Sequence, residues 1–258
     1  MLSKARIKHI RSLEQKKYRT QYGLFVIEGD KIVREILASS LIVECVLAKP
    51  AWLNLLSDCL RAKSQEIIEV NDKELSPISF LKTPNQTMAL VRIPQYSLDM
   101  SELTEGLSLY LNQVQDPGNL GTIIRLADWF GIRHVLCGSG CADPFNPKTV
   151  QSTMGAITRV KTYQTDESFF QLLNIHRPGF DVYGTFLNGE NLYNVSLSPQ
   201  AVIVMGNESK GISDEVAQYV NRHLLIPPYP TGEPTSESLN VATATAIVCA
   251  EFRRRISG

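Results

Sequence analysis

The chain alternates short, strand-like apolar runs with stretches of helical periodicity along nearly its whole length. In its second half the strand-like runs include "LSLYLNQV" from Leu107 and "AVIVMG" from Ala201. Apolar residues recur at helical spacing within 120–130, and the last helical pattern spans 240–255. Strands that alternate with helices of this length favour an α/β fold with an open, mostly parallel sheet.

The first half shows the same alternation and predicts a separate small α/β domain. Its strand-like runs are "GLFVIEG", "LIVECVLA", "EIIEV" and "TMALVRI", and its helical patterns include "DKIVREILAS" and the region from Trp52 to Leu60. The stretch "PQYSLDMSELTEG" that follows has turn residues and acids but little apolar periodicity. We therefore predict a first domain over 1–97, a linker over 98–106 and a second domain over 107–258.

Charge is divided unevenly between these two parts, although the formal net charge of the 258 residues is zero. Residues 1–97 hold 15 basic and 10 acidic side chains, whereas the remainder holds 11 and 16. Such a basic cluster either solvates a helix face or contacts a polyanion such as RNA. The cluster before Tyr22 consists of Lys4, Arg6, Lys8, Arg11, Lys16, Lys17 and Arg19.

Cysteine usage and hydropathy point to a cytoplasmic protein. The five cysteines are scattered, and Cys137 and Cys141 have no second pair or clustered histidines, which argues against a zinc site. No apolar run approaches the ~20 residues of a membrane span, and no apolar core follows the basic N-terminal stretch. We expect reduced, mostly buried cysteines, no metal and no membrane partner.

Three polar stretches suggest a ligand site. They are "NQVQDPGNLGTIIRLADWFG" from Asn112, "MGNESKGIS" from Met205 and "EPTSESLN" from Glu233. Ligands of open α/β sheets bind in the crevice beyond the carboxyl ends of the strands, where the second stretch lies. The first stretch opens a helix with Arg125 one turn inside, and amides at a helix start attract anions. Taken singly, each stretch also fits a capped helix or a decorated loop. The glycine patterns of dinucleotide and nucleoside triphosphate sites are absent, which leaves a nucleotide-dependent enzyme a remote alternative.

Together the three stretches resemble, in order, the signatures of the SpoU-like (TrmH-type) RNA 2′-O-ribose methyltransferases of the SPOUT superfamily. The third signature matches "LLIPPYPTGEPTSESLNVATATAIVCAE". The resemblance covers 107–255, and the first half, especially "FVIEGDKIVREIL", resembles the substrate-binding domain of many members. It implies a deep C-terminal trefoil knot, the cofactor S-adenosylmethionine and a homodimer formed through the methyltransferase domain.

The resemblance also implies a set of site residues. Its cofactor contacts fall on Thr185, which we place in the loop of its strand, and on Gly206, Ile226 and Leu239. The loop between Ile226 and Leu239 is longer than is usual in the family. The family's polar catalytic residues correspond to Asn119, Arg125, Glu208, Ser238 and Asn240.

The chemistry of methyl transfer to a ribose is compatible with these residues. The 2′-hydroxyl is a poor nucleophile, so the protein must align it, deprotonate it and hold the neighbouring phosphate. The pKa of an arginine exceeds ~12, which favours phosphate anchoring by Arg125 over proton abstraction. Glu208 either holds Arg125 or Asn119 in place or acts as the base, if burial raises its pKa.

We therefore predict S-adenosylmethionine-dependent 2′-O-methylation of a structured RNA. Ribosomal RNA is favoured because the first domain resembles that of ribosomal-RNA members, and transfer RNA is the alternative. A different class of function, a catalytically silent RNA-binding or ribosome-assembly factor of the same fold, is disfavoured by the intact polar residues.

Overall fold

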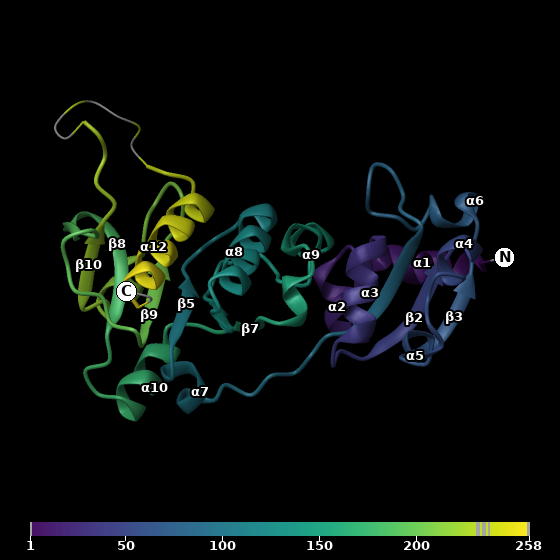
Figure 1. The fold of residues 1–258 in the computed structure, drawn as a ribbon, viewed down its shortest axis with the longest axis horizontal. Coiled ribbons are helices and arrows are strands. Elements are labelled where there is room, and N and C mark those ends of the chain that lie inside the picture. The colour runs from purple at the N-terminus through teal and green to yellow at the C-terminus, as the bar shows by residue number, and fades with distance from the viewer. Residues whose placement is uncertain (1, 231–232, 234–235, 237, 257–258) are drawn as a thin grey trace. The chain divides into compact units, whose positions relative to one another are not determined.

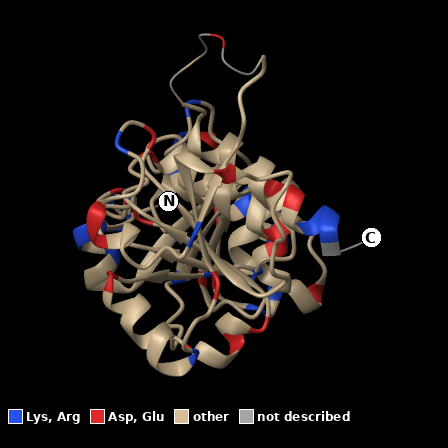
Figure 2. Cartoon of the chain, turned by 90° about the vertical axis from the view of Figure 1, so that its left-hand side faces the viewer, with Lys and Arg blue, Asp and Glu red and all other residues tan. Residues whose placement is uncertain are grey.

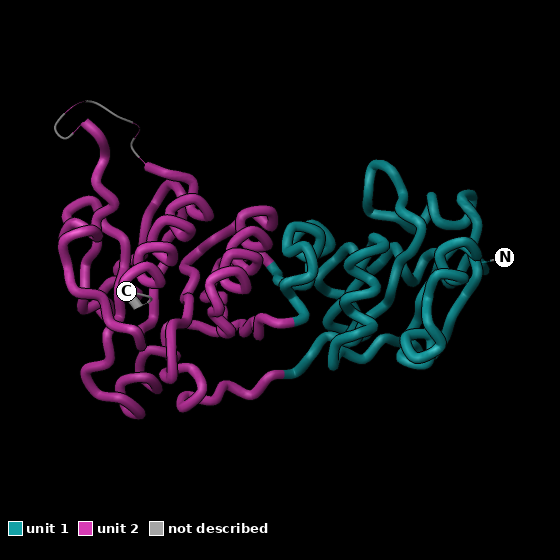
Figure 3. The backbone as a smooth tube through the Cα atoms, in the orientation of Figure 1, with its two compact units in different colours: residues 1–95, 143–158 teal, residues 96–142, 159–258 magenta. Residues whose placement is uncertain are grey.

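The structure is a computed structural model, and it describes residues 2–230, 233, 236 and 238–256. Part of the lengthened loop between Ile226 and Leu239, namely 231–232, 234–235 and 237, lies outside the described residues. The chain divides into two compact units (Figure 3). The first contains 1–95 and 143–158, and the second contains 96–142 and 159–258.

The first unit is built on a mixed four-stranded sheet with the strand order β1-β4-β2-β3. β4 pairs antiparallel with both β1 and β2, whereas β2 and β3 are parallel. Two apolar clusters cover its two faces, one around Val33 and Val46 and the other around Ile10 and Leu47. The strands are β1 (Leu24–Glu28), β2 (Val43–Ala48), β3 (Ser64–Glu69) and β4 (Thr87–Arg92).

The helices of this unit follow the predicted pattern with one difference. The helix expected from Trp52 to Leu60 is two short helices, because the chain turns over 54–57, where Asn54 and Ser57 are residue types that favour helix ends. The helices are α1 (Lys4–Ser12), α2 (Lys16–Tyr22), α3 (Asp30–Ala38), α4 (Pro50–Leu53), α5 (Asp58–Arg61), α6 (Asp72–Leu75) and α9 (Pro147–Thr153), followed by a 3-10 turn over Ala156–Thr158.

The segment 143–158 joins the first unit, although we expected it within the methyltransferase domain. The Phe145 ring lies 5.0 Å from that of Phe25, and Val150 and Ile157 are buried in the same cluster as Val33. Burying these apolar side chains against β1 and α3 favours this arrangement.

The second unit contains a six-stranded sheet with the order β10-β8-β9-β5-β6-β7, and every pairing is parallel. This confirms the predicted α/β class with a mostly parallel sheet. The strands are β5 (Leu107–Leu111), β6 (His134–Cys137), β7 (Lys161–Gln164), β8 (Val182–Asn191), β9 (Ala201–Met205) and β10 (Arg222–Leu225).

Helices cover both faces of this sheet (Figure 1). Apolar side chains of α7, α10 and α11 pack on one face around Tyr110 and Val204, and α8 packs beside α12 on the other. The helix α7 lies within the expected linker. The helices are α7 (Met100–Thr104), α8 (Pro117–Trp129), α10 (Ser168–His176), α11 (Asp214–Ala217) and α12 (Val241–Ile256). Within the part of the chain that the structure describes, no helix has the length and apolarity to cross a membrane.

The last turn of α12 is basic, and its arginines bind this helix to other segments of the second unit. Figure 2 shows this turn in blue beside the C label. Arg253 Nε donates to the Phe130 carbonyl at the end of α8, over 2.6 Å. Glu251 accepts from Arg254 and Arg255, and Arg255 also donates to backbone carbonyls beyond β8.

Candidate active site

The strand order places a topological switch point at β5, whose neighbours are β9 on one side and β6 on the other. Leu111 ends β5 directly opposite Met205, which ends β9. The loops that leave these two strands therefore begin side by side. In open α/β sheets, ligands usually bind beyond the carboxyl ends of the strands at such a switch point.

The side chains of two asparagines form hydrogen bonds between these two loops. Asn112, which follows β5 and is buried, accepts at Oδ1 from the backbone N–H of Ser213 over 2.7 Å. Asn207, in the loop after β9, donates from Nδ2 to the Gln113 carbonyl over 2.8 Å. Gln113 has a positive φ of 58°, which turns the chain out of the strand. Each loop is therefore held by a side chain of the other.

The loop after β9 is a tight turn. The backbones of Asn207 and Gly211 exchange two hydrogen bonds of 2.8 and 2.9 Å, and the Asn207 side chain also accepts from the Ser209 N–H. A Cβ at Gly206 would lie 2.4 Å from the carbonyl carbon of Gly211, so only glycine fits at Gly206.

Asn119 lies at the centre of the polar network. It is in the first turn of α8, where its backbone N–H donates to the Asp116 side chain that caps the helix, over 2.9 Å. Its Nδ2 donates to Glu208 Oε1 over 2.6 Å, and its Oδ1 accepts from Asn240 Nδ2 over 3.0 Å. The Ser238 hydroxyl donates to the Glu208 carbonyl over 3.2 Å. The network thus joins residues of all three polar stretches.

Arg125 stands apart from this network. It lies on α8 and is exposed, and it has no hydrogen bond or ion pair with any residue that the structure describes. Its guanidinium is therefore free to meet an anion from outside the chain, as phosphate anchoring requires. Of the two contacts considered for Glu208, the structure has the one with Asn119.

The four residues expected to contact the cofactor lie in β8, directly after β9 and β10, and shortly before α12. Gly206 follows β9, Ile226 follows β10 and is half-buried, and Leu239 precedes α12 with 46% of its surface exposed. Thr185 lies inside β8 rather than in the loop we expected. It directly follows the residue of β8 that pairs with Val204, so it is level with the end of β9.

The nearby thiol Cys141 plays a structural part. Its Sγ donates to the Leu111 carbonyl at the end of β5 over 3.1 Å. Burial raises the pKa of Cys141 to about 11, so at neutral pH the group is a thiol and not a nucleophilic thiolate.

The basic residues of α1 and α2 belong to the first unit, and they differ in whether their charged groups are exposed to an external phosphate. Contrary to expectation, Arg19 is not a surface phosphate ligand, because it is 2% exposed and paired with Asp143. Arg6 is ion-paired with Glu66, and Arg11 donates to the Ser79 carbonyl. The exposed side chains of the cluster are Lys4, Lys8, Lys16 and Lys17.

Sequence reasoning did not single out Asn112, Gln113 or Asn207. All three stand within the quoted polar stretches, directly after strand-like runs. An asparagine at a strand end is a signal for a side-chain-stabilised turn, and it would have marked Asn112 and Asn207. Their pairing depends on β5 and β9 being neighbours in the sheet, which only the structure gives.

Fold and site together define an α/β protein with a polar network at the switch point of a parallel sheet. The chain belongs to the SpoU rRNA Methylase family, whose model matches residues 106–250. A second model, the MRM3-like substrate binding domain, matches residues 4–89.

Individual relatives agree with this family over nearly the whole chain. The 23S rRNA (guanosine(2553)-2′-O)-methyltransferase RlmP of Bacillus subtilis is 32% identical over 254 residues, which is 96% of each chain. A TrmH-family protein from Porphyromonas gingivalis has a structure that matches with a TM-score of 0.88 and 42% identity over 99% of both chains. The AdoMet-bound rRNA methyltransferase from Sinorhizobium meliloti matches with a TM-score of 0.86 and 29% identity, over 99% of this chain and 97% of that one.

Proposed function

We propose that this chain transfers the methyl group of S-adenosylmethionine to a ribose 2′-hydroxyl of ribosomal RNA. The observation that carries the proposal is the network in which Asn119, Glu208 and Asn240, from three separate stretches, meet beside the carboxyl ends of β5 and β9. Family membership and the relatives' 2′-O-methyltransferase names support it. The bacterial 23S rRNA methyltransferase among the relatives supports a cytoplasmic location for the proposed activity.

The four residues expected to contact the cofactor have side chains and backbone that fit S-adenosylmethionine. Ile226 and Leu239 offer apolar side chains for a flat adenine ring, and the tight turn at Gly206 leaves backbone amides and carbonyls beside the end of β9. Thr185 adds a half-buried hydroxyl. When bound, the cofactor supplies a methyl group already activated by its sulfonium charge.

The chain's own residues then align and hold the ribose. Glu208 and Asn240 fix the Asn119 amide from both sides, so its orientation is set before substrate arrives. Arg125, unengaged within the described part of the chain, anchors the RNA phosphate next to the reacting ribose. Its positive charge stabilises the negative charge that develops on the 2′-oxygen as the hydroxyl gives its proton to a water molecule. Glu208 serves as a positioning residue, because its carboxylate already accepts from Asn119.

We further propose that the stretches at Gly206, Ile226 and Ser238–Asn240 take part in the trefoil knot of the family and that two copies of the chain form the active enzyme. The return of Ser238 and Asn240 to Glu208 and Asn119 supports the first proposal. The indole of Trp129, 84% exposed at the end of α8, supports the second by offering an apolar contact. A sedimentation experiment that finds a 28.8 kDa species at micromolar concentration would contradict the dimer.

The proposed reaction is tested by incubating the purified protein with methyl-labelled S-adenosylmethionine and with ribosomal and transfer RNA in separate reactions. We expect alkali-resistant, 2′-O-methylated dinucleotides from ribosomal RNA. If only transfer RNA is labelled, transfer RNA is the substrate class of the chain and ribosomal RNA is not. If no RNA is labelled and calorimetry detects no cofactor binding, the chain is instead a silent RNA-binding factor.

A further inference from the structure

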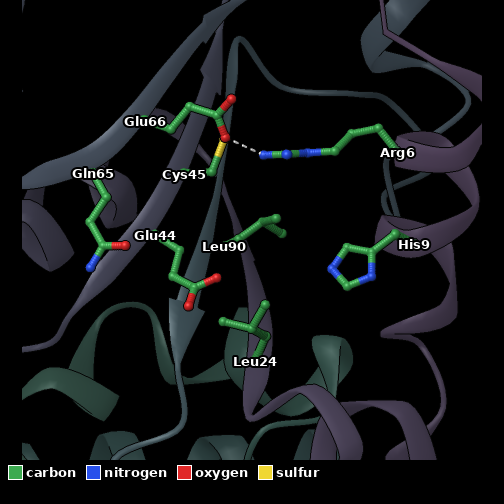
Figure 4. Close-up of a pocket in the computed structure, with 8 residues that line it drawn as sticks. All are labelled: Arg6, His9, Leu24, Glu44, Cys45, Gln65, Glu66 and Leu90. Atoms are coloured by element: carbon green, nitrogen blue, oxygen red, sulfur yellow. Dashed lines mark hydrogen bonds and ion pairs between the residues drawn. The ribbon is translucent and has the colours of Figure 1, made fainter.

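A hollow of about 260 Å³ lies in the first unit between α1 and the sheet (Figure 4). Its floor consists of the buried side chains of Leu24, Cys45 and Leu90, from β1, β2 and β4. Its walls are polar. An apolar floor with a few convergent polar groups is the usual composition of a small-ligand site. The polar lining consists of Arg6, His9, Glu44, Gln65 and Glu66.

Arg6 is incompletely satisfied in this hollow. Its Nη2 donates to Glu66 Oε2 over 2.5 Å, which fixes the guanidinium across the space between α1 and β3. Its Nε–H is buried and has no oxygen or nitrogen acceptor among the described residues, and the guanidinium lies against the weakly accepting Cys45 thiol. A buried N–H that faces only a weak acceptor is poorly satisfied, so a ligand that brings an oxygen or ring nitrogen would be stabilised here.

The charges of the hollow exclude an anion and favour a neutral ligand with N–H donors. Glu66 and Glu44 both face the space, and the pair of Glu44 with Arg92, at 2.8 Å, leaves the second carboxylate oxygen of Glu44 available. Carboxylates repel a phosphate and accept hydrogen bonds from a base edge. Burial raises the pKa of Cys45 to about 11, so the floor carries no thiolate at neutral pH.

We propose that this hollow binds an unpaired guanine base of the RNA substrate. Guanine presents N–H donors for Glu44 and Glu66 and, on its other edge, the acceptors O6 and N7 for Arg6. The His9 ring lies 4.5 Å from that of Tyr22 and adds an aromatic surface for stacking. The volume is below the ~300–1,000 Å³ of sites for larger ligands, which suits a single base.

This inference rests on the proposed function, because it assumes an RNA substrate, and it adds a base-specific subsite to the first unit. The exposed Lys4 and Lys8, on the same helix as Arg6 and His9, would meet the flanking phosphates. Phosphate contacts position an RNA, whereas the base in the hollow would select its sequence.

The test uses the full chain and three fluorescently labelled hexaribonucleotides, UUGUUU, UUAUUU and the same strand with inosine in place of guanosine. Anisotropy titrations at one fixed salt concentration should give a dissociation constant about ten-fold lower for the guanosine strand than for the other two. Glu66→Gln should abolish most of this preference without changing affinity for UUAUUU. The matched control, Glu69→Gln, changes an exposed carboxylate of the same strand and should keep the preference.

Equal binding of all three strands by the unmodified chain would overturn the inference, as would an unchanged preference in Glu66→Gln. If that variant melts at a lower temperature, Glu44→Gln provides the same comparison. A chain that methylates ribosomal RNA but shows no guanosine preference refutes the subsite alone. A guanosine preference without methyl transfer refutes the proposed function alone.

Discussion

Removing the Asp143 carboxylate should destabilise the first unit strongly, because Asp143 is the counterion of a buried arginine. Arg19 is 2% exposed, and its Nε donates to Asp143 Oδ2 over 3.0 Å. Its Nη1 donates to the carbonyls of Leu13 and Glu14 over 2.8 and 2.7 Å. These contacts hold α2 against the loop that precedes α9.

The size of the effect follows from burial. Asp143→Ala leaves the guanidinium buried with only two neutral acceptors, and breaking such a pair costs about 3–5 kcal/mol. The matched control is Glu44→Ala, which removes the carboxylate partner of Arg92. That arginine is 54% exposed, so the control should cost at most about 1 kcal/mol. The double variant Arg19→Met with Asp143→Leu should recover part of the loss, since it removes the uncompensated charge.

Urea unfolding followed by tryptophan fluorescence measures this difference. Trp52 is buried in the first unit, whereas Trp129 is exposed in the second, so a Trp129→Phe background reports on the first unit alone. With a slope of about 1–3 kcal/mol per molar urea, Asp143→Ala should lower the midpoint by at least about 1 M. A shift no larger than that of Glu44→Ala would refute the assignment of 143–158 to this unit's core.

Three further predictions concern RNA binding, catalysis and acid stability. Replacing Lys4, Lys8, Lys16 and Lys17 by Ala should reduce the slope of log affinity for RNA against log salt concentration by about three, since each lost phosphate contact contributes about 0.7. An unchanged slope in filter binding would show that these lysines only solvate their helices. Asn119→Ala should lower kcat by up to about 100-fold through misalignment and leave S-adenosylmethionine affinity in calorimetry unchanged, with Thr122→Ala, exposed on the same helix, as the control; wild-type turnover in Asn119→Ala would contradict the role given to the network. Arg254 and Arg255 lower the pKa of Glu251 from 4.5 to about 2, so the contribution of this carboxylate to stability is present above pH 4.5 and is lost as the pH falls toward 2. Glu251→Gln should therefore lower the melting temperature at neutral pH but show a smaller additional decrease in acid than the unmodified chain. Parallel melting curves across this pH window would contradict the stabilising role of Glu251.

Much of the fold was predictable because local apolar periodicity reports which backbone conformation buries a segment. The pattern identified β1, α3, β5 and β9 and the α/β class. The affiliation of 143–158 was not predictable in this way. Phe145, Val150 and Ile157 are equally apolar whether they pack on the sheet of one unit or the other, and periodicity does not name the partner surface.

Local sequence patterns also do not show which charged residues become buried, or which distant residues they contact. Arg19 resembles its exposed neighbours in sequence, and its burial depends on Asp143, 124 residues further along the chain. The resemblance to known signatures identified Asn119, Glu208 and Asn240, whose mutual contacts span 89 and 121 residues. The interlocked pair of Asn112 and Asn207 required knowledge that β5 and β9 are neighbours, which a single sequence does not contain.

The most direct test of the proposed reaction and its site is nucleoside mass spectrometry of ribosomal RNA after a single turnover with S-adenosylmethionine. The RNA is transcribed in vitro, so it carries no earlier modification. We predict one new methyl group, found on the ribose fragment of one nucleotide, and its loss when Arg125→Ala is used at the same cofactor occupancy. A methyl group on a base, or undiminished ribose methylation by Arg125→Ala, would contradict the account.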